Sequence, residues 1–186
     1  MLRLEGTKIV LRGGRNKDIA PLYGYICDPF VQKYLALKPP PDIERFGERL
    51  REWMSPSERD YYFVIATKAD NAAIGLLRLH WNTANVGELS FWIGRWFWGK
   101  GYAAEAAGKA GIFAFTELGL DSLVTHVLAG NARALSLVQK LGFEAVGAHR
   151  LDSDEPLKGQ EIILKVDRHG FLWVDPAMPG EEKIKQ

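Results

Sequence analysis

Residues 94–105 read Gly94-Arg-Trp-Phe-Trp-Gly99-Lys100-Gly101-Tyr102-Ala103-Ala104-Glu105, and they carry more information about this chain than any other segment. The segment follows an apolar strand pattern over 86–93 and opens an alanine-rich helix pattern over 101–118. A glycine loop at such a junction offers free backbone N–H groups and the positive end of a helix dipole to an anion, usually a phosphate. The sequence therefore predicts a phosphate-binding loop between a strand and a helix.

Three phosphate chemistries use a loop of this kind. A P-loop fits Gly94 to Lys100, but the next residue is Gly101, where the metal ion needs Ser or Thr. A dinucleotide site fits Gly99 to Ala104, but the next strand pattern ends in neutral residues at 128–131, where an acid should bind ribose. A coenzyme A pyrophosphate site requires neither the metal ligand nor the ribose-binding acid, so every group that it needs is present. Glycines that only permit a tight turn are the alternative that the loop by itself leaves open.

Composition and charge indicate one ordinary globular domain. The chain has 186 residues, of which 47% are hydrophobic and 25% are charged, and this is enough for a substantial core. We expect a single domain over 1–174 and a polar C-terminal tail over 175–186. Lys plus Arg number 24 and Asp plus Glu number 23, a balance that argues against stable nucleic-acid binding.

Cysteine, histidine and hydropathy patterns set further limits. Cys27 is the only cysteine, so no intrachain disulfide can form. The four histidines, at 80, 126, 149 and 169, lack the sequence spacing of metal ligands, and we expect no metal site. The N-terminus lacks an apolar signal segment, and no apolar run approaches the roughly 20 residues of a membrane span. These patterns predict a soluble, cytoplasmic protein without membrane contact.

Hydrophobic periodicity predicts an alternation of strands and helices. Strand patterns cover 8–12, 61–67, 73–80, 86–93, 123–128, 144–150 and 160–166, and helix patterns cover 16–26, 30–35, 43–53, 101–118 and 132–141. Asp42 is placed to cap the third helix, and Gly142 to end the last one. A strand meander followed by crossover helices implies an α/β (α+β) fold, with a mixed central sheet of about seven strands and helices on its faces.

Three segments share their order and spacing with a known family. Residues 87–94, Gly-Glu-Leu-Ser-Phe-Trp-Ile-Gly, are similar to that family's central strand. Residues 98–106 are close to the pattern W-G-K-G-Y-A-x-E-A, and residues 131–143 are similar to N-x-x-S-x-x-x-x-x-K-L-G-F. Each motif alone is weak, but the three together are specific. The chain thus resembles the GNAT superfamily of N-acetyltransferases, and within it the ribosomal-protein N-terminal acetyltransferases RimJ and RimL.

This resemblance implies the GNAT fold, in which a mixed, mostly antiparallel sheet is splayed between the strands at 86–93 and 123–128. Acetyl-CoA is the implied co-substrate, and its pantetheine arm would lie in the gap as an added strand. The pyrophosphate would sit on N–H groups of the glycine loop, where positions without side chains let phosphate oxygens approach. The implied cofactor-binding residues are Phe91, Trp92, Ile93, Trp98, Gly99, Lys100, Gly101, Tyr102, Ala103, Ala104 and Asn131.

The leaving-group side departs from the family pattern. Many members carry Tyr at the position of Val138 as a proton donor to the departing thiolate, and valine cannot donate a proton. The RimJ-like group often has Ser at the position of Ala134, which is equally inert. Ser136 is near in sequence but lies about 160° round the helix from Ala134, and we assign it no role. A bound water, or no acid at all, would serve the thiol leaving group.

Glu88 is the candidate catalytic residue, as a base that takes the proton of the amine through water. On the central strand it shares a face with Ser90 and Trp92. A charged residue on a partly solvated strand face is the alternative of equal weight. Glu105 has a structural role by position, because it lies in the first turn of a helix with Lys109 four residues on.

The implied activity is direct attack of a primary amine on the acetyl thioester. An α-amino group with a pKa near 7.8 is about one tenth unprotonated at pH 7, whereas a lysine near 10.4 is far less so, and an N-terminal acceptor therefore demands little of the base. We expect a protein or peptide N-terminal amine as the acceptor. The alternatives are a small amine, such as an antibiotic, a polyamine or an amino acid, and an acyl-CoA-binding module without turnover. The acidic segment 151–155 could attract a cationic amine, and the protein could be a monomer or a homodimer.

Overall fold

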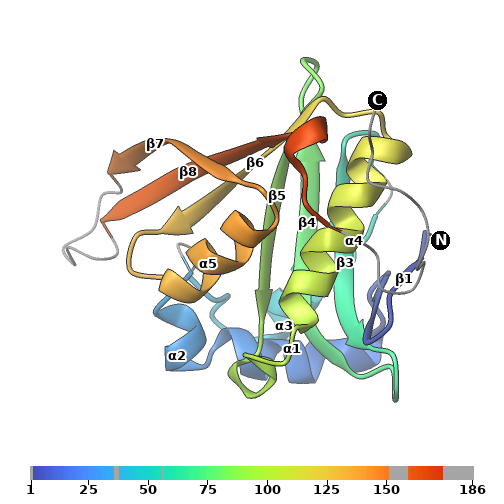
Figure 1. Cartoon of the computed structure of the whole chain (residues 1–186). Helices are drawn as coiled ribbons and strands as arrows, with labels where there is room; N and C mark the ends of the chain where they lie inside the picture. The colour runs from blue at the N-terminus through green and yellow to red at the C-terminus, as the bar shows by residue number, and fades with distance from the viewer. Residues whose placement is uncertain (1, 36–37, 56, 151–158, 174–186) are drawn as a thin grey trace.

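One eight-stranded sheet organises the chain (Figure 1). The protein is seen here as a computed structural model, which describes residues 2–35, 38–55, 57–150 and 159–173. The strand order is β1-β2-β3-β4-β5-β6-β8-β7, and every neighbouring pair is antiparallel except β5–β6, which is parallel. The strands are β1 (Leu4–Glu5), β2 (Ile9–Arg12), β3 (Asp60–Thr67), β4 (Ala73–Trp81), β5 (Val86–Ile93), β6 (Ser122–Leu128), β7 (Glu144–Arg150) and β8 (Gln160–Asp167). A mixed, mostly antiparallel sheet is therefore confirmed.

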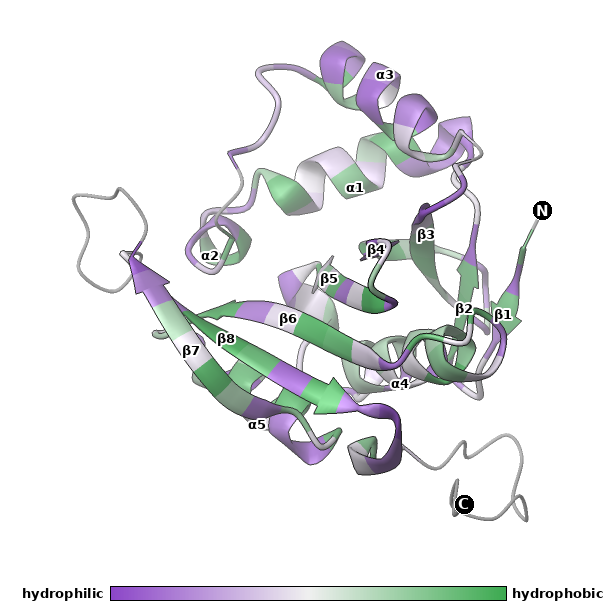
Figure 2. Ribbon diagram, turned by 90° about the horizontal axis from the view of Figure 1, so that it is seen from above, coloured by the Kyte–Doolittle hydropathy of each residue, from purple (hydrophilic) through white to green (hydrophobic). Residues whose placement is uncertain are grey.

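The helices lie on both faces of this sheet. Figure 2 shows α1 and α3 on one side, and α4 and α5 on the other. Their bounds are α1 (Ile19–Ile26), α2 (Pro29–Gln32), α3 (Ile43–Trp53), α4 (Tyr102–Thr116) and α5 (Ala132–Lys140), with 3-10 turns at η1 (Asn16–Asp18), η2 (Arg95–Phe97) and η3 (Arg168–Gly170). Asp42 caps α3 as expected, because its Oδ1 accepts from the Arg45 N–H at 2.8 Å. Gly142 follows α5 with a φ of +91°, which suits a helix end.

The seven predicted strands match β2 to β8 within two residues at each end. The eighth, β1, was missed, because a two-residue strand is too short to show a period of two. The predicted helices correspond to η1 with α1, and to α2, α3, α4 and α5, although α2 ends at Gln32 and α4 at Thr116, each earlier than expected. Residues 151–155 and the expected tail at 175–186 lie outside the described residues.

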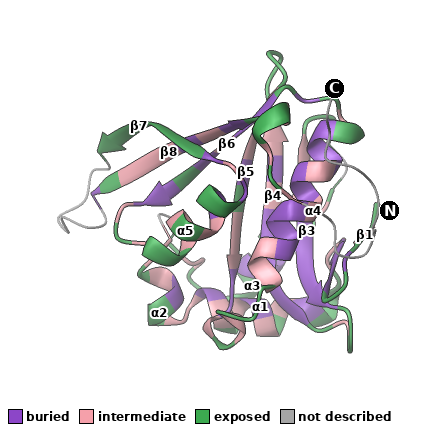
Figure 3. Ribbon diagram, viewed as in Figure 1, coloured by how far each residue is buried: buried purple, intermediate pink, exposed green. Residues whose placement is uncertain are grey.

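Two apolar layers hold the helices to the sheet. Phe46 and Leu50 of α3 and Leu22 of α1 pack against one face in a buried cluster with Val64 and Leu76. The alanines of α4 pack against the other face, and Figure 3 shows most of this helix as buried. Small side chains allow α4 to approach the sheet closely, so its N-terminus is held firmly beside the end of β5.

Strands β5 and β6 part soon after they begin. Their parallel pairing joins only residues 86–88 of β5 to residues 122–124 of β6. Beyond these pairs, β5 stays paired with β4 and β6 with β8 (Figure 1). Just past the last pair, the buried hydroxyl of Thr125 donates to the Leu89 carbonyl oxygen at 2.8 Å. This side-chain bond takes the place of the next ladder bond and fixes where the gap opens. The splayed sheet that the resemblance implies is therefore present.

Candidate functional site

A cavity of about 810 Å³ lies at the gap between β5 and β6. Its walls come from the end of β5, the loop and first turn of α4, helix α5, the segment that follows α2 and residues 172–173. All the residues predicted to bind the cofactor line this cavity except Lys100. The Lys100 ammonium lies 5.9 Å from the centre of the Phe97 ring, and the residue is exposed.

The glycine loop forms one end of the cavity. Gly99 and Gly101 have φ values of +73° and +84°, in the left-handed region that glycine adopts without strain. A Cβ on Gly99 would meet nothing within 4 Å, and one on Gly101 would meet only Lys8 Nζ at 3.5 Å. The space beside both positions is therefore open. The positive φ accounts for a glycine at each position, and the open space leaves room for a phosphate to approach the backbone.

The first turn of α4 supplies the N–H groups. The first bond inside the helix runs from the Glu105 N–H to the Gly101 carbonyl oxygen at 3.0 Å. The N–H groups of Tyr102, Ala103 and Ala104 come before it, and a helix has no internal partner for them. All three residues line the cavity. Free N–H groups at a helix N-terminus are suited to binding an anion.

The exposed edge of β5 forms the middle of the site. Alternate residues of a strand direct their backbone polar groups to opposite edges. The Gly94 N–H donates to the Ile74 carbonyl on the β4 side, whereas the Leu89 carbonyl accepts from Thr125 on the β6 side. The backbone N–H and carbonyl groups of Phe91 and Ile93 are therefore directed toward β6, with which neither residue is paired. Of the predicted strand residues, Trp92 directs its backbone to β4 instead and contributes its side chain to the cavity.

Trp98 helps to shape this edge. Its indole N–H donates to the Ile93 carbonyl oxygen at 2.9 Å, and the Leu89 carbonyl is already bonded to Thr125. The groups of β5 left to face the gap are thus the N–H and carbonyl of Phe91 and the N–H of Ile93. An extended ligand with amide groups could pair with these as an added strand.

Cationic side chains that the sequence analysis did not assign also lie at the site, Lys8 and Arg133 among them. Lys8, at the start of the chain, donates from Nζ to the Lys100 carbonyl oxygen at 3.3 Å. The Arg133 guanidinium lies 5.4 Å from the centre of a Trp98 ring and lines the cavity. Arg133 could have been found from its position two residues after Asn131. For Lys8 the sequence carries no signal, because only the packing of β2 beside α4 brings it there.

Glu105 has the structural role expected of it, with additional partners. Its side chain is buried and accepts from the N–H groups of Thr7 and Lys8, the latter at 2.9 Å. It therefore joins the turn between β1 and β2 to the first turn of α4. The expected pairing with Lys109 alone would not have revealed this tie, which also holds Lys8 next to the glycine loop.

Helix α5 closes the other side of the cavity. Asn131 has the capping role expected of it, because its Oδ1 accepts from the Ala134 N–H at 3.1 Å. Val138 is 1% exposed and belongs to the core, while Ala134 lines the cavity. Ser136 also borders the cavity, despite its different place round the helix. Across from α5, Tyr34 contributes a phenol that sequence reasoning missed, since its segment resembles the family least.

Glu88 lies where β5 and β6 part, since it forms the last residue pair between them. Its Oε1 accepts from the Ser90 hydroxyl at 3.4 Å, and His80 is its direct neighbour on β4. The face that these side chains share is the one covered further along by α1 and α3. The sequence placed Glu88, Ser90 and Trp92 together, and the cross-strand register agrees. Glu88 itself is outside the lining of the cavity.

An ion pair on β3 and β4 lies beside Glu88 on this face. Arg78 Nη2 lies 2.6 Å from Asp60 Oδ2, and the hydrogen bonds from Arg78 to Asp60 raise the pKa of the Arg78 guanidinium above its ordinary value. Burial raises the pKa of the neighbouring Tyr62 phenol. Arg78 is therefore a permanent cation and Tyr62 a neutral phenol at neutral pH, and both lie within electrostatic reach of Glu88.

Known proteins share this architecture. Residues 8–144 match the family described as Acetyltransferase (GNAT) domain. The N-acetyltransferase p20 of Bacillus licheniformis, whose name gives no substrate, is 28% identical over 166 residues, which cover 87% of this chain and 92% of that protein. YdaF of Bacillus subtilis, named as a candidate ribosomal N-acetyltransferase, is 26% identical over 147 residues, which cover 62% of this chain and 80% of that protein.

A solved structure shares the fold over nearly its whole length. Spermidine N-acetyltransferase from Vibrio cholerae, in complex with CoA and spermine, superposes with a TM-score of 0.76 at 20% identity. The match covers 90% of this chain and 99% of that one. Among the described residues, no helix is both long and apolar enough to cross a membrane.

Proposed function

This chain belongs to the GNAT acetyltransferase family, and from that premise we propose that it moves an acetyl group from acetyl-CoA to the N-terminal amine of a protein or peptide. The proposed acceptor is of the kind used by the RimJ and RimL group, and YdaF, with its ribosomal name, supports it. A ribosomal protein as acceptor would place the enzyme in the cytoplasm. Both the acceptor and the location are our proposals, while the acetyltransferase activity follows from the family.

The observation that carries the proposal is the unpaired edge of β5 in a cavity that reaches the N-terminus of α4. The thioester that acetyl-CoA supplies is the activated acyl group of the reaction. We assign its pantetheine amides to Phe91 and Ile93, and its pyrophosphate to the N–H groups between Gly99 and Ala104. Arg133 and Lys140 line the same cavity and add positive charge, which suits a polyanionic ligand.

The described lining of the cavity that we assign to acetyl-CoA offers no carboxylate to a polycationic acceptor. None of the described residues that line it is an aspartate or a glutamate. A polycation such as spermine is held in proteins by carboxylates or by aromatic faces, and desolvating it without an opposite charge is costly. The fold shared with a spermidine acetyltransferase keeps a small amine as the second candidate, with Glu88 as the carboxylate that would attract it.

Glu88 is our candidate for the base, acting through water on the attacking amine. Glu88 forms the last residue pair between β5 and β6, and we expect the acceptor to enter on the face that its side chain shares. A backbone N–H at the end of β5 would polarise the carbonyl of the thioester as negative charge develops on it. Val138 is buried and has no proton to donate, so we propose a bound water as the proton source for the thiolate. The Tyr34 phenol, which lines the cavity, is the candidate for this role among the protein groups.

A thiol-release assay tests the function. Acetyl-CoA is mixed with peptides carrying free N-termini, N-terminally blocked peptides with an internal lysine, and spermidine, and free CoA thiol is measured. We expect release with free N-termini and little with the blocked lysine peptides. Release with spermidine alone would favour the second candidate. Tight binding of acetyl-CoA without release for any amine would leave only a binding module.

A matched pair of variants tests the base. Glu88→Gln should lower turnover by roughly a hundredfold with a smaller effect on acetyl-CoA affinity. The control is Glu117→Gln, which changes an exposed carboxylate at the end of α4 and should leave turnover unchanged. If both variants turn over at the rate of the unaltered protein, Glu88 is only a charged residue on a solvated face.

A further inference from the structure

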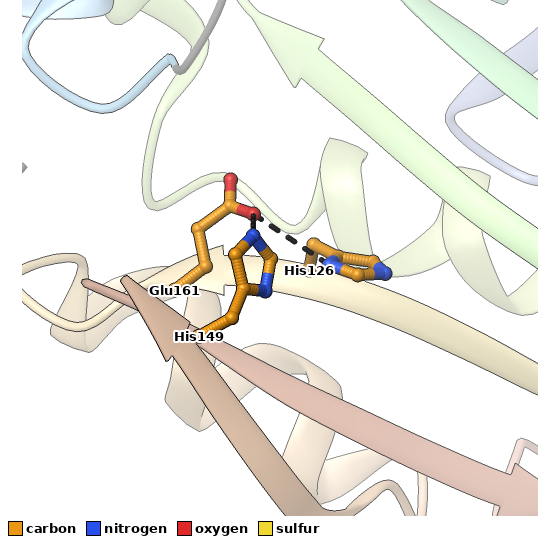
Figure 4. Close-up of side chains that lie close together, drawn as sticks. All are labelled: His126, His149 and Glu161. Atoms are coloured by element: carbon orange, nitrogen blue, oxygen red, sulfur yellow. Dashed lines mark ion pairs between the residues drawn. The ribbon is translucent and has the colours of Figure 1, made fainter. Parts of the chain in front are cut away.

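Two histidines and a glutamate that are far apart in the sequence lie close together on the half of the sheet formed by β6, β8 and β7. Figure 4 shows His126 of β6, His149 of β7 and Glu161 of β8 turned toward one another. Their nitrogen and oxygen donor atoms all lie within 4.8 Å of one another. His126 and His149, which lack metal-ligand spacing in the sequence, are therefore neighbours in space.

The pairing of the strands explains why the three side chains meet. His149 is the direct partner of Glu161 across the β7–β8 ladder, and His126 pairs with Ile163, two residues from Glu161 on the same face. Each side chain comes from a different strand of a hydrogen-bonded sheet. The donor atoms are therefore held on a rigid surface rather than on a loop, which lowers the entropic cost of binding a ligand.

The two separations between Glu161 and the histidines are compatible with metal coordination. Glu161 Oε2 lies 3.5 Å from His126 Nδ1 and 3.3 Å from His149 Nε2. Hydrogen bonds between nitrogen and oxygen are usually 2.7–3.2 Å long, so both contacts are long. Two ligands of a tetrahedral zinc ion with bonds of about 2.0–2.1 Å are about 3.3–3.4 Å apart, and both separations are close to this value.

The chemistry and exposure of the donors also fit a metal. Two imidazoles and one carboxylate are a donor set that zinc uses when it keeps one coordination position open. The two histidine side chains are 33% and 43% exposed, and Glu161 is 12% exposed, so an ion can enter while the carboxylate is partly shielded. Lys165, on the same face of β8, pairs with Asp167 at 3.2 Å rather than competing for Glu161.

We propose that His126, His149 and Glu161 bind a divalent transition metal ion, with Zn²⁺ the best fit. The three residues lie on the same face of the sheet as Glu88. His126 is two residues beyond Val124, the β6 partner of Glu88, and thus lies on the wall of the gap between β5 and β6. Magnesium and calcium do not fit, because they prefer oxygen ligands to imidazole. This site does not depend on the proposed acceptor.

Metal binding can be measured without any acetyl transfer. Protein without a histidine tag is stripped with EDTA, dialysed, and titrated with ZnCl₂ against a chromogenic chelator. We expect one equivalent of zinc to bind to the unaltered protein, and MgCl₂ in excess not to displace it. His149→Gln and Glu161→Gln should each weaken zinc binding by about a hundredfold or more, since loss of a ligand exceeds loss of an outer-sphere partner.

His169→Gln is the matched control, because it removes an exposed histidine of η3 that is outside the cluster. It should keep the zinc affinity of the unaltered protein. Circular dichroism and the melting temperature without metal verify that each variant is folded. Absence of stoichiometric zinc binding, or equal affinity in His149→Gln and His169→Gln, would overturn the site and leave the three residues as an exposed ion-pair cluster.

Discussion

Replacing Gly101 with alanine gives the most direct test of the phosphate-binding loop. Gly101 has a φ of +84°, a conformation that costs an L residue about 1–2 kcal/mol. The added Cβ would meet only Lys8 Nζ, at 3.5 Å, so the fold has room for a methyl group. For a domain of this size each kcal/mol lowers the melting temperature by about 2–4 °C. We expect a folded variant that melts about 2–8 °C lower.

The effect of Gly101→Ala on the binding of acetyl-CoA should be larger than its effect on stability, and it has a different cause. Gly101 lines the cavity, so the methyl group takes up space next to the N–H groups of the helix end. Loss of one hydrogen bond to a charged group costs about 1.5–3 kcal/mol. This corresponds to an increase of about 10- to 100-fold in the dissociation constant of acetyl-CoA, which isothermal titration calorimetry can measure.

Gly119 offers a control with the same backbone problem elsewhere. It lies beyond the other end of α4, has a φ of +66°, and a Cβ there would meet nothing within 4 Å. Gly119→Ala should therefore lose similar stability and bind acetyl-CoA normally. If the two variants bind acetyl-CoA equally well, the loop does not hold the pyrophosphate and the site assignment is wrong.

Three further outcomes follow from individual contacts. Thr125→Val leaves the Leu89 carbonyl without its partner and should lower the free energy of unfolding in urea by about 1–3 kcal/mol. Thr116→Val, which removes an exposed hydroxyl, should lower it by less than about 0.5 kcal/mol. Equal losses would contradict a special role for Thr125. Glu105→Gln removes a buried carboxylate that accepts from Thr7 and Lys8, and should likewise destabilise by about 1–3 kcal/mol, against no change for Glu117→Gln. Hydrogen bonds from the Thr67 hydroxyl and the Ala72 N–H lower the pKa of the Asp70 carboxyl. The Asp70 carboxylate therefore stabilises the fold above the pKa of the unfolded state, near 3.9, and this stabilisation is lost as the pH falls through the lower pKa of the folded state. The difference in melting temperature between the protein and Asp70→Asn should thus shrink from pH 7 to pH 3. A constant difference would refute this.

The local pattern of residues was enough to predict the strands, the helices and the glycine loop between β5 and α4. Patterns of apolar residues predicted β2 to β8 within two residues at each end. The loop was readable because its features are local: two glycines, a strand before them and a helix after them. The same holds for Asp42 and Asn131, whose capping bonds reach only three residues along the chain. Such features depend on neighbours in sequence, which one chain displays in full.

Only the tertiary structure decided which distant residues become neighbours. The strand order β6-β8-β7 puts the last strand inside the sheet. The register of these three strands then brings His126, His149 and Glu161 together. Packing of α4 beside β2 brings Lys8 to the glycine loop, and Thr125 bonds to Leu89 only where two strands diverge. A hydrophobic period tells which face of a strand is buried but not which strand lies beside it. Pairing between strands depends on contacts across the whole sheet, so these sites emerge only when the chain has folded.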